Sequence, residues 1–577
     1  MTAPDAERAA ADVPDLLRDL DPEQRRAAET LLGPVCVLAG AGTGKTRALT
    51  HRIAHGVATG VYDPSRVMAL TFTTRAAGEM RTRLRALGAG GVSARTFHST
   101  ALAQLAHFWP QLVGGSQPRI LEGKGRLIAQ AAESLKLRLD TAGLRDVAAE
   151  IEWRKVSRMT LAGYERASGS RALPPGVDVD KMIALQQNYE SIKDQRRQLD
   201  FEDVLLATAG MLESEPRVAD EVRSQYRFFV VDEYQDVSPL QQELLELWLG
   251  PRTDLCVVGD ASQTIYSFAG ASSDFLLGFG ARYPDATVVR LERNYRSDPP
   301  ILTLANRLMR GRAGALELKA EAISGSEAQI TSHPNDAAEH KAVATAIAAE
   351  IAAGTRPENI AVLFRVNSQA AGLVSALAEA GISSRQLGAT KFFDLDIVKR
   401  AVLELTSYAR TAAPAPLFQS VSDVLRHLGW TLTAPEAGGA VREKWEALNA
   451  LVELADQAPE GTTLAAFVDE LRSRQAAQHE PTVSAVVLST VHSAKGLEWD
   501  SVHIVGLSEG LLPVNHARGL AAIDEERRLL YVAITRARRR LSLTWSQEGF
   551  RGHSREPSRF LAELRTSTRD AASRSSR

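Results

Sequence analysis

The chain contains little cysteine, with only Cys36 and Cys256 among its 577 residues. Each lies in a short apolar run flanked by valine or leucine, which is typical of a buried strand. A thiol in such a run usually packs as a small hydrophobic side chain, and we see no spacing of cysteine and histidine that would suit zinc. We therefore expect neither a disulfide nor a zinc site.

Long apolar runs are missing as well. No stretch approaches the ~20 residues that cross a bilayer, and the acidic, alanine-rich N-terminus lacks the charged and apolar regions of a secretory signal. Hydrophobic residues make up 44% of the chain and charged residues 24%, as in soluble globular proteins. We therefore expect a cytoplasmic protein with no membrane partner, divided into several domains because this length exceeds a single hydrophobic core.

A strong net charge of either sign is absent. The formal charge is −2 and the isoelectric point lies near 6.7, so a nucleic-acid partner would have to bind a local basic surface. Three basic groups are candidates, although each is individually more typical of a solvated helix face than of a DNA contact. They are Arg75, Arg81, Arg83 and Arg85; Arg154, Lys155 and Arg158; and Arg536, Arg538, Arg539 and Arg540.

A phosphate-binding loop follows the apolar run at residues 35–38. The loop consists of Ala39, Gly40, Ala41, Gly42, Thr43, Gly44, Lys45 and Thr46. Glycines let backbone N–H groups turn toward a polyphosphate, and the positive end of the following helix faces the same anion. Lys45 would contact the β- and γ-phosphates of ATP and Thr46 would bind Mg²⁺. The one departure from the strict motif is Ala39, which stands where the first glycine is usual.

Two carboxylates end the next apolar run, within F-F-V-V-D-E-Y-Q-D at residues 228–236. At the end of a strand in a nucleotide-binding sheet, Asp232 would hold Mg²⁺ through water and Glu233 would orient and deprotonate the attacking water. Alone, such a pair of carboxylates is more often part of a solvated turn than a catalytic pair. Because the chain also carries a phosphate-binding loop, the catalytic interpretation is favoured. A third run, residues 255–258, is followed by Gln263, which could sense the γ-phosphate.

Three later segments make the pattern specific. They are L-E-R-N-Y-R-S (291–297), T-V-H-S-A-K-G-L-E-W (490–499) and E-E-R-R-L-L-Y-V-A-I-T-R-A-R (525–538). In their order and residue types, these segments and the earlier ones resemble the motifs of the UvrD/Rep/PcrA family of superfamily 1 DNA helicases. The resemblance extends from an early glutamine motif at residues 20–24 to about residue 565. The resemblance implies an α/β fold of two RecA-like P-loop domains with parallel sheets, each interrupted by a mainly helical insertion.

The resemblance also implies further residues of the ATP site. Arg296 and Arg536 would act as arginine fingers on the transferring phosphoryl group. Gln24, the stem of Arg47 and the ring of Tyr295 would hold adenine. Glu498 would lie near the ribose.

Single-stranded DNA would need rings on which bases can stack. The residues that the family motifs suggest for DNA contact are Phe72, Thr96, Phe97, His98, Tyr266, Phe268, His492 and Phe550. Relatives carry tryptophan and arginine where this chain has Phe268 and Ala269, and histidine where it has Val514. The grip on DNA is therefore expected to be weaker or differently distributed.

We expect five parts in the chain. The first RecA-like domain would comprise residues 1–105 and 190–298, with a helical insertion at 106–189. The second would comprise residues 299–395 and 482–565, with a small helical insertion at 396–481. Residues 566–577, rich in serine and arginine, would be a disordered tail. The second insertion is about half the size usual in better-known members.

The implied function is an ATP- and Mg²⁺-dependent 3′–5′ DNA helicase that acts on single-stranded and partial-duplex DNA in repair or replication, with partner proteins from those processes. Because the second insertion is short, an alternative is a single-strand translocase that hydrolyses ATP but unwinds poorly alone. A DNA-binding scaffold with an inactive ATPase is a further alternative, against which the intact ATP motifs argue.

Overall fold

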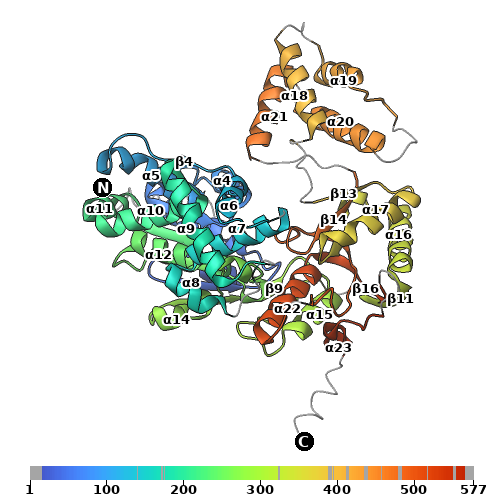
Figure 1. Cartoon of the computed structure of the whole chain (residues 1–577). Helices are drawn as coiled ribbons and strands as arrows, with labels where there is room; N and C mark the ends of the chain where they lie inside the picture. The colour runs from blue at the N-terminus through green and yellow to red at the C-terminus, as the bar shows by residue number, and fades with distance from the viewer. Residues whose placement is uncertain are drawn as a thin grey trace, which may run out of the picture. The chain divides into compact units, whose positions relative to one another are not determined.

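A computed structural model describes residues 16–565, apart from residues 140, 170–172, 174–175, 323–324, 388–392, 394, 411–414, 434–439, 457, 460, 478–483, 516 and 550–553 (Figure 1). The expected tail at 566–577 lies outside the described residues. The chain forms two compact units, one of Met1–Glu292 with Ala313–Leu316 and one of Arg293–Arg312 with Glu317–Arg577. Among the described helices, none is both long enough and apolar enough to cross a bilayer.

The two units divide after Glu292 rather than at the expected boundary of 298–299. Strand β9 (Arg293–Asn294) pairs with β10 (Lys319–Ala320). The hydroxyl of Ser297 donates to the carbonyl of Ala537 at 2.6 Å. These bonds tie the N-Y-R-S segment, and with it Arg296, to the second unit.

The first unit is built on a parallel sheet with strand order β3-β2-β6-β7-β1-β8. Its strands are β1 (Val35–Ala39), β2 (Val67–Thr71), β3 (Ser93–Thr96), β6 (Phe228–Val231), β7 (Leu255–Gly259) and β8 (Thr287–Leu291). Parallel sheets are covered on both faces, which explains why the central strands are uninterrupted apolar runs. The two cysteines enter different hydrophobic cores, Cys36 on one face and Cys256 on the other.

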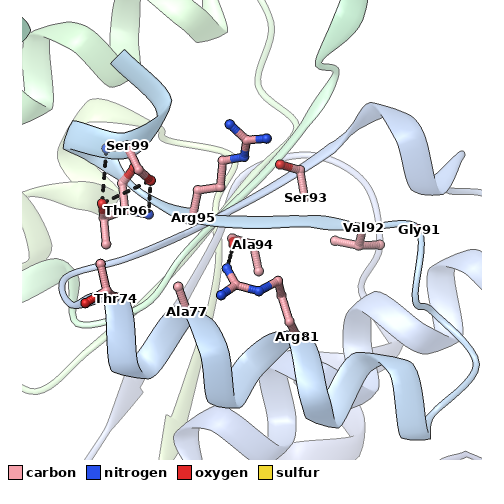
Figure 2. Close-up of a pocket in the computed structure, with 10 residues that line it drawn as sticks. All are labelled: Thr74, Ala77, Arg81, Gly91, Val92, Ser93, Ala94, Arg95, Thr96 and Ser99. Atoms are coloured by element: carbon pink, nitrogen blue, oxygen red, sulfur yellow. Dashed lines mark hydrogen bonds between the residues drawn. The ribbon is translucent and has the colours of Figure 1, made fainter. Parts of the chain in front are cut away.

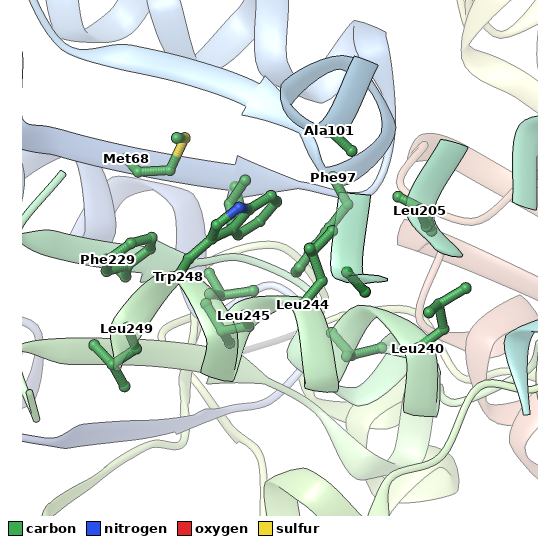
Figure 3. Packing of buried hydrophobic residues seen from close by; sticks show 14 of the residues in the cluster. Met68, Phe97, Ala101, Leu205, Phe229, Leu240, Leu244, Leu245, Trp248 and Leu249 are labelled. Atoms are coloured by element: carbon green, nitrogen blue, oxygen red, sulfur yellow. The ribbon is translucent and has the colours of Figure 1, made fainter. Parts of the chain in front are cut away.

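Helices cover this sheet and fill its cores. They are α2 (Pro22–Glu29), α3 (Lys45–Ala58), α4 (Thr74–Ala86), α5 (Phe97–Leu112), α10 (Phe201–Ser214), α11 (Pro216–Gln225), α12 (Pro239–Leu249), α13 (Asp274–Leu277) and α14 (Phe279–Arg282). In one core, Trp248 lies beside Phe97, Phe229 and Leu245 (Figure 3). The buried indole N–H of Trp248 donates to Gln104 at 2.8 Å, so its polar atom is satisfied.

A helical insertion interrupts the first unit between α5 and α10. It contains α6 (Gly125–Ser134), α7 (Thr141–Val156), α8 (Leu161–Ser168) and α9 (Val179–Gln195) around its own core. The chain enters through β4 (Arg119–Ile120) and leaves through β5 (Gln198–Leu199), which pair with each other. Because α5 continues to Leu112 and α9 to Gln195, these paired strands mark the insertion better than the expected limits of 106 and 189.

A buried charge network fastens the insertion to α10. The ammonium group of Lys155 on α7 lies 2.8 Å from a carboxylate oxygen of Asp200 and 2.6 Å from one of Asp203. Lys193 on α9 contacts the same two carboxylates. Burial alone would lower the pKa of Lys155, but the surrounding carboxylates raise it, so the ammonium stays charged.

The second unit repeats the parallel architecture with strand order β11-β16-β15-β12-β14-β13. Its strands are β11 (Gln329–Asn335), β12 (Ile360–Phe364), β13 (Ser384–Gln386), β14 (Val486–Thr490), β15 (Trp499–Ile504) and β16 (Ala537–Glu548). Its helices are α15 (Pro299–Met309), α16 (Asp336–Ala352), α17 (Ala370–Glu379), α22 (Leu520–Ile534) and α23 (Arg559–Arg565). Two parallel α/β sheets of this kind are RecA-like, as the sequence motifs predict.

Within the residues that the structure describes, four helices form the small insertion of the second unit. They are α18 (Asp396–Ala409), α19 (Leu417–His427), α20 (Ala440–Asp456) and α21 (Leu464–Ala477) (Figure 1). Their apolar faces meet in a core of their own that includes Leu405, Leu425 and Leu451. The insertion therefore packs as a helical bundle, as its composition predicts.

Candidate nucleotide and DNA site

The phosphate-binding loop joins β1 to α3. Gly42 and Gly44 have φ angles of 69° and 80°, a left-handed backbone that glycine adopts without strain. The N–H of Gly40 donates to the carbonyl of Leu291 at 3.2 Å, and the hydroxyl of Thr43 donates to the carbonyl of Gly40 at 2.8 Å. No side chain caps the N-terminus of α3 at Gly44, which leaves its first N–H groups able to face an anion.

Gln24 supports this loop from the side. Its amide nitrogen donates to the carbonyl of Thr43 at 2.8 Å, and its side chain is almost fully buried. A Cβ atom on Gly44 would lie only 2.6 Å from that nitrogen, so Gly44 must be glycine for Gln24 to fit. The sequence suggested only an adenine contact for Gln24. Arg47 is exposed and donates to the carbonyl of Asp19 at 2.7 Å.

Asp232 and Glu233 stand at the end of β6. Burial and the neighbouring Glu233 carboxylate raise the pKa of Asp232 to about 7, against the opposing effect of Lys45. Glu233 has a φ of 52°, which is uncommon for any residue other than glycine. A carboxylate oxygen of Glu233 accepts from the amide of Gln235 at 2.5 Å. Lys45 and Asp232 therefore interact electrostatically at one edge of the sheet, where the sequence placed both.

A chain of hydrogen bonds leads from Glu233 to Gln263. The amide oxygen of Gln235 accepts from the backbone N–H of Asp260 at 2.9 Å. The amide nitrogen of Gln263 donates to the carboxylate of Asp260 at 2.7 Å. Sequence analysis missed Gln235 and Asp260, although both are polar residues that follow strand ends. A Cβ on Gly259 would lie 2.7 Å from the Gln235 oxygen, so this network also needs a glycine.

The predicted arginine fingers meet inside the second unit. Arg296 donates to the carbonyl of Thr535 at 3.3 Å, and Arg536 donates to the hydroxyl of the same residue at 3.3 Å. Arg536 is nearly fully buried and also donates to the carbonyl of Leu497 at 3.1 Å. The two guanidinium groups are thus held by one threonine.

Glu498 belongs to the same group of side chains. Its carboxylate pairs with both Arg296 and Arg538. Burial lowers the pKa of Arg296, and the Glu498 carboxylate opposes that effect. Tyr295 has 47% of its surface exposed. The structure therefore brings Tyr295, Arg296, Glu498 and Arg536 into one region of the second unit.

Three of the predicted stacking residues gather on the first unit. The rings of Phe72 and Tyr266 are stacked, with centroids 5.9 Å apart and an interplanar angle of 12°. Phe268 meets Tyr266 edge-on, with centroids 6.2 Å apart. Phe72 and Phe268 are 39% and 55% exposed. Phe72 follows β2 and the other two follow β7, so these rings form an aromatic surface at one edge of the sheet.

Other expected DNA contacts differ. Phe97 is 2% exposed and stacks on Trp248 in the core, so it offers no ring face to a base and its predicted role is corrected to packing. The hydroxyl of Thr96 caps α5 by accepting from the N–H of Ser99. His98 lies edge-on to Phe201, a half-exposed ring that sequence analysis missed.

The two histidines among the expected DNA contacts, His98 and His492, both have a lowered pKa. Burial and a nearby Lys124 lower the pKa of His98 to about 4. Burial, Arg365 and Lys495 lower the pKa of His492 to about 4. Both rings are neutral at pH 7 and add no positive charge toward a phosphate. Phe550, the remaining predicted contact, lies outside the described residues.

Two of the three candidate basic groups contain residues that are paired or buried within the structure. Lys155 belongs to the buried network of the insertion, and Arg158 pairs with Glu243. In the later group, Arg536 is buried and Arg538 pairs with Glu498, because the run forms the start of β16. These four side chains are therefore paired or buried within the protein, whereas Arg539 and Arg540 of the later group are exposed. In the first group, on α4, only Arg75 has an ion pair among the described residues, with Glu79.

Comparison with known proteins gives the family. The model of the UvrD/REP helicase N-terminal domain matches residues 20–284, and the model of the UvrD-like helicase C-terminal domain matches residues 289–434 and 415–548. The ATP-dependent DNA helicase UvrD2 of Mycobacterium tuberculosis (strain ATCC 25618 / H37Rv) is 46% identical over 580 residues, covering 96% of this chain and 83% of the relative.

Two further relatives are more distant. DNA helicase II of Haemophilus influenzae is 30% identical over 96% of this chain and 88% of its own length. ATP-dependent DNA helicase PcrA of Bacillus subtilis (strain 168) is 28% identical over 95% of this chain and 86% of its own length. The chain therefore belongs to the UvrD/Rep family of helicases.

Proposed function

We propose that this protein is an ATP-dependent DNA helicase that uses Mg²⁺, translocates 3′–5′ on single-stranded DNA and separates duplex ahead of it during DNA repair or replication. One observation carries the proposal. The loop after β7 holds Gln263, hydrogen-bonded toward Glu233, and continues within a few residues to Tyr266 and Phe268 of the aromatic surface. A change at the γ-phosphate can therefore move the rings that stack on DNA.

The residues of the first unit suit ATP hydrolysis. Lys45 supplies positive charge to the β- and γ-phosphates, and Glu233 takes the proton from the attacking water. The hydroxyl of Thr46 and the carboxylate of Asp232 are oxygen ligands of the kind that Mg²⁺ prefers. Bound there, Mg²⁺ would neutralise phosphate charge. Since the pKa of Asp232 is raised to about 7 without metal, binding the cation would require its proton to leave.

Two arginines of the second unit are the proposed arginine fingers. Arg296 and Arg536 share Thr535, so a movement that carries one guanidinium carries the other. As arginine fingers they would spread positive charge over the phosphoryl group in the transition state. Tyr295 would stack on adenine and Glu498 would contact the ribose. ATP binding would then draw the two units toward each other and hydrolysis would release them.

The short second insertion favours an alternative. The alignment with PcrA extends over 645 positions, more than the 577 residues of this chain, so the relative carries segments that this chain lacks. The alternative is a translocase that moves on single-stranded DNA but unwinds poorly without a partner protein.

The test compares partial duplexes with a 3′ or a 5′ single-stranded tail, with ATP hydrolysis followed in parallel. Unwinding of the 3′-tailed duplex alone supports the helicase and its polarity. DNA-stimulated hydrolysis without strand separation supports the translocase. A Lys45→Ala variant is the control, and hydrolysis that persists in it, or a wild type that DNA never stimulates, contradicts the ATPase proposal.

A further inference from the structure

A polar pocket of about 650 Å³ lies along the outer edge of β3, the edge strand of the first sheet (Figure 2). Its lining includes four hydroxyl residues, Thr74, Ser93, Thr96 and Ser99. Two arginines, Arg81 and Arg95, are the charged residues of its lining, and no carboxylate is among them. A pocket with this lining suits an anion.

The two arginines flank the strand edge from different elements. Arg81 reaches from α4 and donates to the carbonyl of Ala94 at 2.7 Å, which fixes its guanidinium at the edge (Figure 2). Arg95 projects from the strand itself and is exposed, with no side-chain hydrogen bond or ion pair to any described residue. An arginine can present several N–H donors at once, so both residues keep donors available for a ligand.

The position of the pocket connects it to the aromatic surface. Thr74 in its lining stands two residues after Phe72, so the Cα atoms of these residues lie within ~7 Å of each other. A DNA strand that left the stacked rings of Phe72 and Tyr266 toward Thr74 would therefore reach the pocket within about one nucleotide. The overall charge of −2 makes a local cationic surface of this kind necessary for phosphate binding.

We infer that this pocket, with Arg81 and Arg95, binds the phosphate backbone of the single-stranded DNA that passes the aromatic surface. The inference rests on the proposed function and extends the DNA footprint beyond the stacking residues. Arg81 occupies the outward carbonyl of Ala94, which an added peptide strand would need, so an extended peptide is disfavoured as the occupant. The absence of carboxylates from the lining disfavours a cation.

The test measures binding of oligo-dT by fluorescence anisotropy for the wild type, Arg95→Gln and the matched control Arg217→Gln. Arg217 is an exposed arginine on α11 that does not line the pocket and belongs to none of the candidate basic groups. Loss of one charge-assisted phosphate contact should weaken binding about fivefold for Arg95→Gln at moderate salt and leave the control near wild type. The slope of log affinity against log salt should fall by about 0.7 for Arg95→Gln alone.

A second arm locates the phosphate. Replacing single phosphates of the oligonucleotide by neutral methylphosphonates should reveal one or two adjacent linkages that matter to the wild type and no longer matter to Arg95→Gln. Equal affinities and slopes for Arg95→Gln and Arg217→Gln, with an unchanged methylphosphonate profile, would overturn the inference about the pocket but not the proposed function. A methylphosphonate profile with no sensitive linkage, together with stabilisation of the wild type by inorganic phosphate, would assign the pocket to free phosphate and overturn the DNA assignment. A wild type that neither binds DNA nor is stimulated by it would overturn the proposed function itself.

Discussion

The guanidinium group of Arg365 holds both carboxylate oxygens of Glu526, with nitrogen–oxygen distances of 2.8 to 3.1 Å. Arg365 directly follows β12, and Glu526 lies on α22, the helix that leads to Arg536. The carboxylate of Glu526 also accepts from the backbone N–H of Val514 at 3.3 Å. This nearly buried pair therefore fixes the register of α22 against the strand end and the loop at Val514.

Glu526→Gln should weaken the second unit, because Arg365 would lose its charged partner in a poorly hydrated place. Removing one member of such a pair typically costs about 3 kcal/mol. Hydrogen exchange of the amides in α22 and β12 would report the loss. Glu404→Gln is the control, since its pair with Arg400 is exposed and should contribute less than about 0.5 kcal/mol. Equal exchange in both variants would mean that the Arg365 pair does not hold α22.

Glu233→Gln should keep ATP binding and stop turnover. The amide has nearly the same shape as the carboxylate but cannot accept the proton of the attacking water, so we expect a loss of at least about 100-fold in the rate of hydrolysis. A fluorescent ATP analogue and a single-turnover assay would separate binding from chemistry. Hydrolysis at the wild-type rate would remove Glu233 from this role.

Asp232→Asn should abolish hydrolysis and yet stabilise the ligand-free protein at alkaline pH. The pKa of Asp232 rises from 3.8 to about 7 on folding, so the folded state binds its proton more tightly than the unfolded chain. Stability from this group is full below about pH 4 and is lost as the pH rises to about 7. We expect the melting temperature of Asp232→Asn to exceed that of the wild type by a few degrees at pH 8 and by less at pH 5. A constant difference across this range would contradict the linkage.

Phe268→Ala should reduce DNA stimulation of the ATPase more than the basal rate. The ring is 55% exposed and meets Tyr266, and loss of one stacking platform costs about 1 to 3 kcal/mol of single-strand affinity. Phe418→Ala, which removes another exposed phenylalanine from the small helical insertion, is the control. Equal loss of basal and stimulated rates in Phe268→Ala would indicate a packing role instead.

Lys155→Met should loosen the first insertion. It leaves Asp200 and Asp203 with one ammonium partner instead of two, at an expected cost of about 3 kcal/mol. Hydrogen exchange is the suitable measurement, because a protein of two units has no single unfolding transition. Faster exchange should be confined to α7, α9 and α10. Lys181→Met, which breaks an exposed pair with Asp178, should leave exchange unchanged.

The central strands and the residues at their ends could be predicted because the signal is local. Residues 35–39, 228–231 and 255–259 are apolar runs buried on both faces, and polar residues follow each of them. Strand β3 gave no such signal, since Ser93–Thr96 is an edge strand with an exposed side. Strand β16 was hidden because its first residues read as an arginine run.

What the sequence could not show depends on partners far apart in the chain. Lys155 and Arg538 belong to candidate basic groups, and each is paired in the structure, Lys155 with Asp200 and Arg538 with Glu498. Phe97 belongs to a family motif, but whether its ring faces DNA or Trp248 is decided only by how α5 packs on α12. The role of Gln24 on the phosphate-binding loop was likewise set by tertiary contact.

At Glu233, the left-handed backbone lowers folding stability, while the side chain is the one that we propose for ATP hydrolysis. A side chain held there costs on the order of 1 to 3 kcal/mol, which glycine would avoid. A redesign that optimised only thermal stability would choose glycine at this position. The resulting protein would be more stable but would lack the carboxylate that we propose as the proton acceptor. The left-handed conformation of Glu233 therefore carries a cost in folding stability that the proposed proton-accepting role would explain.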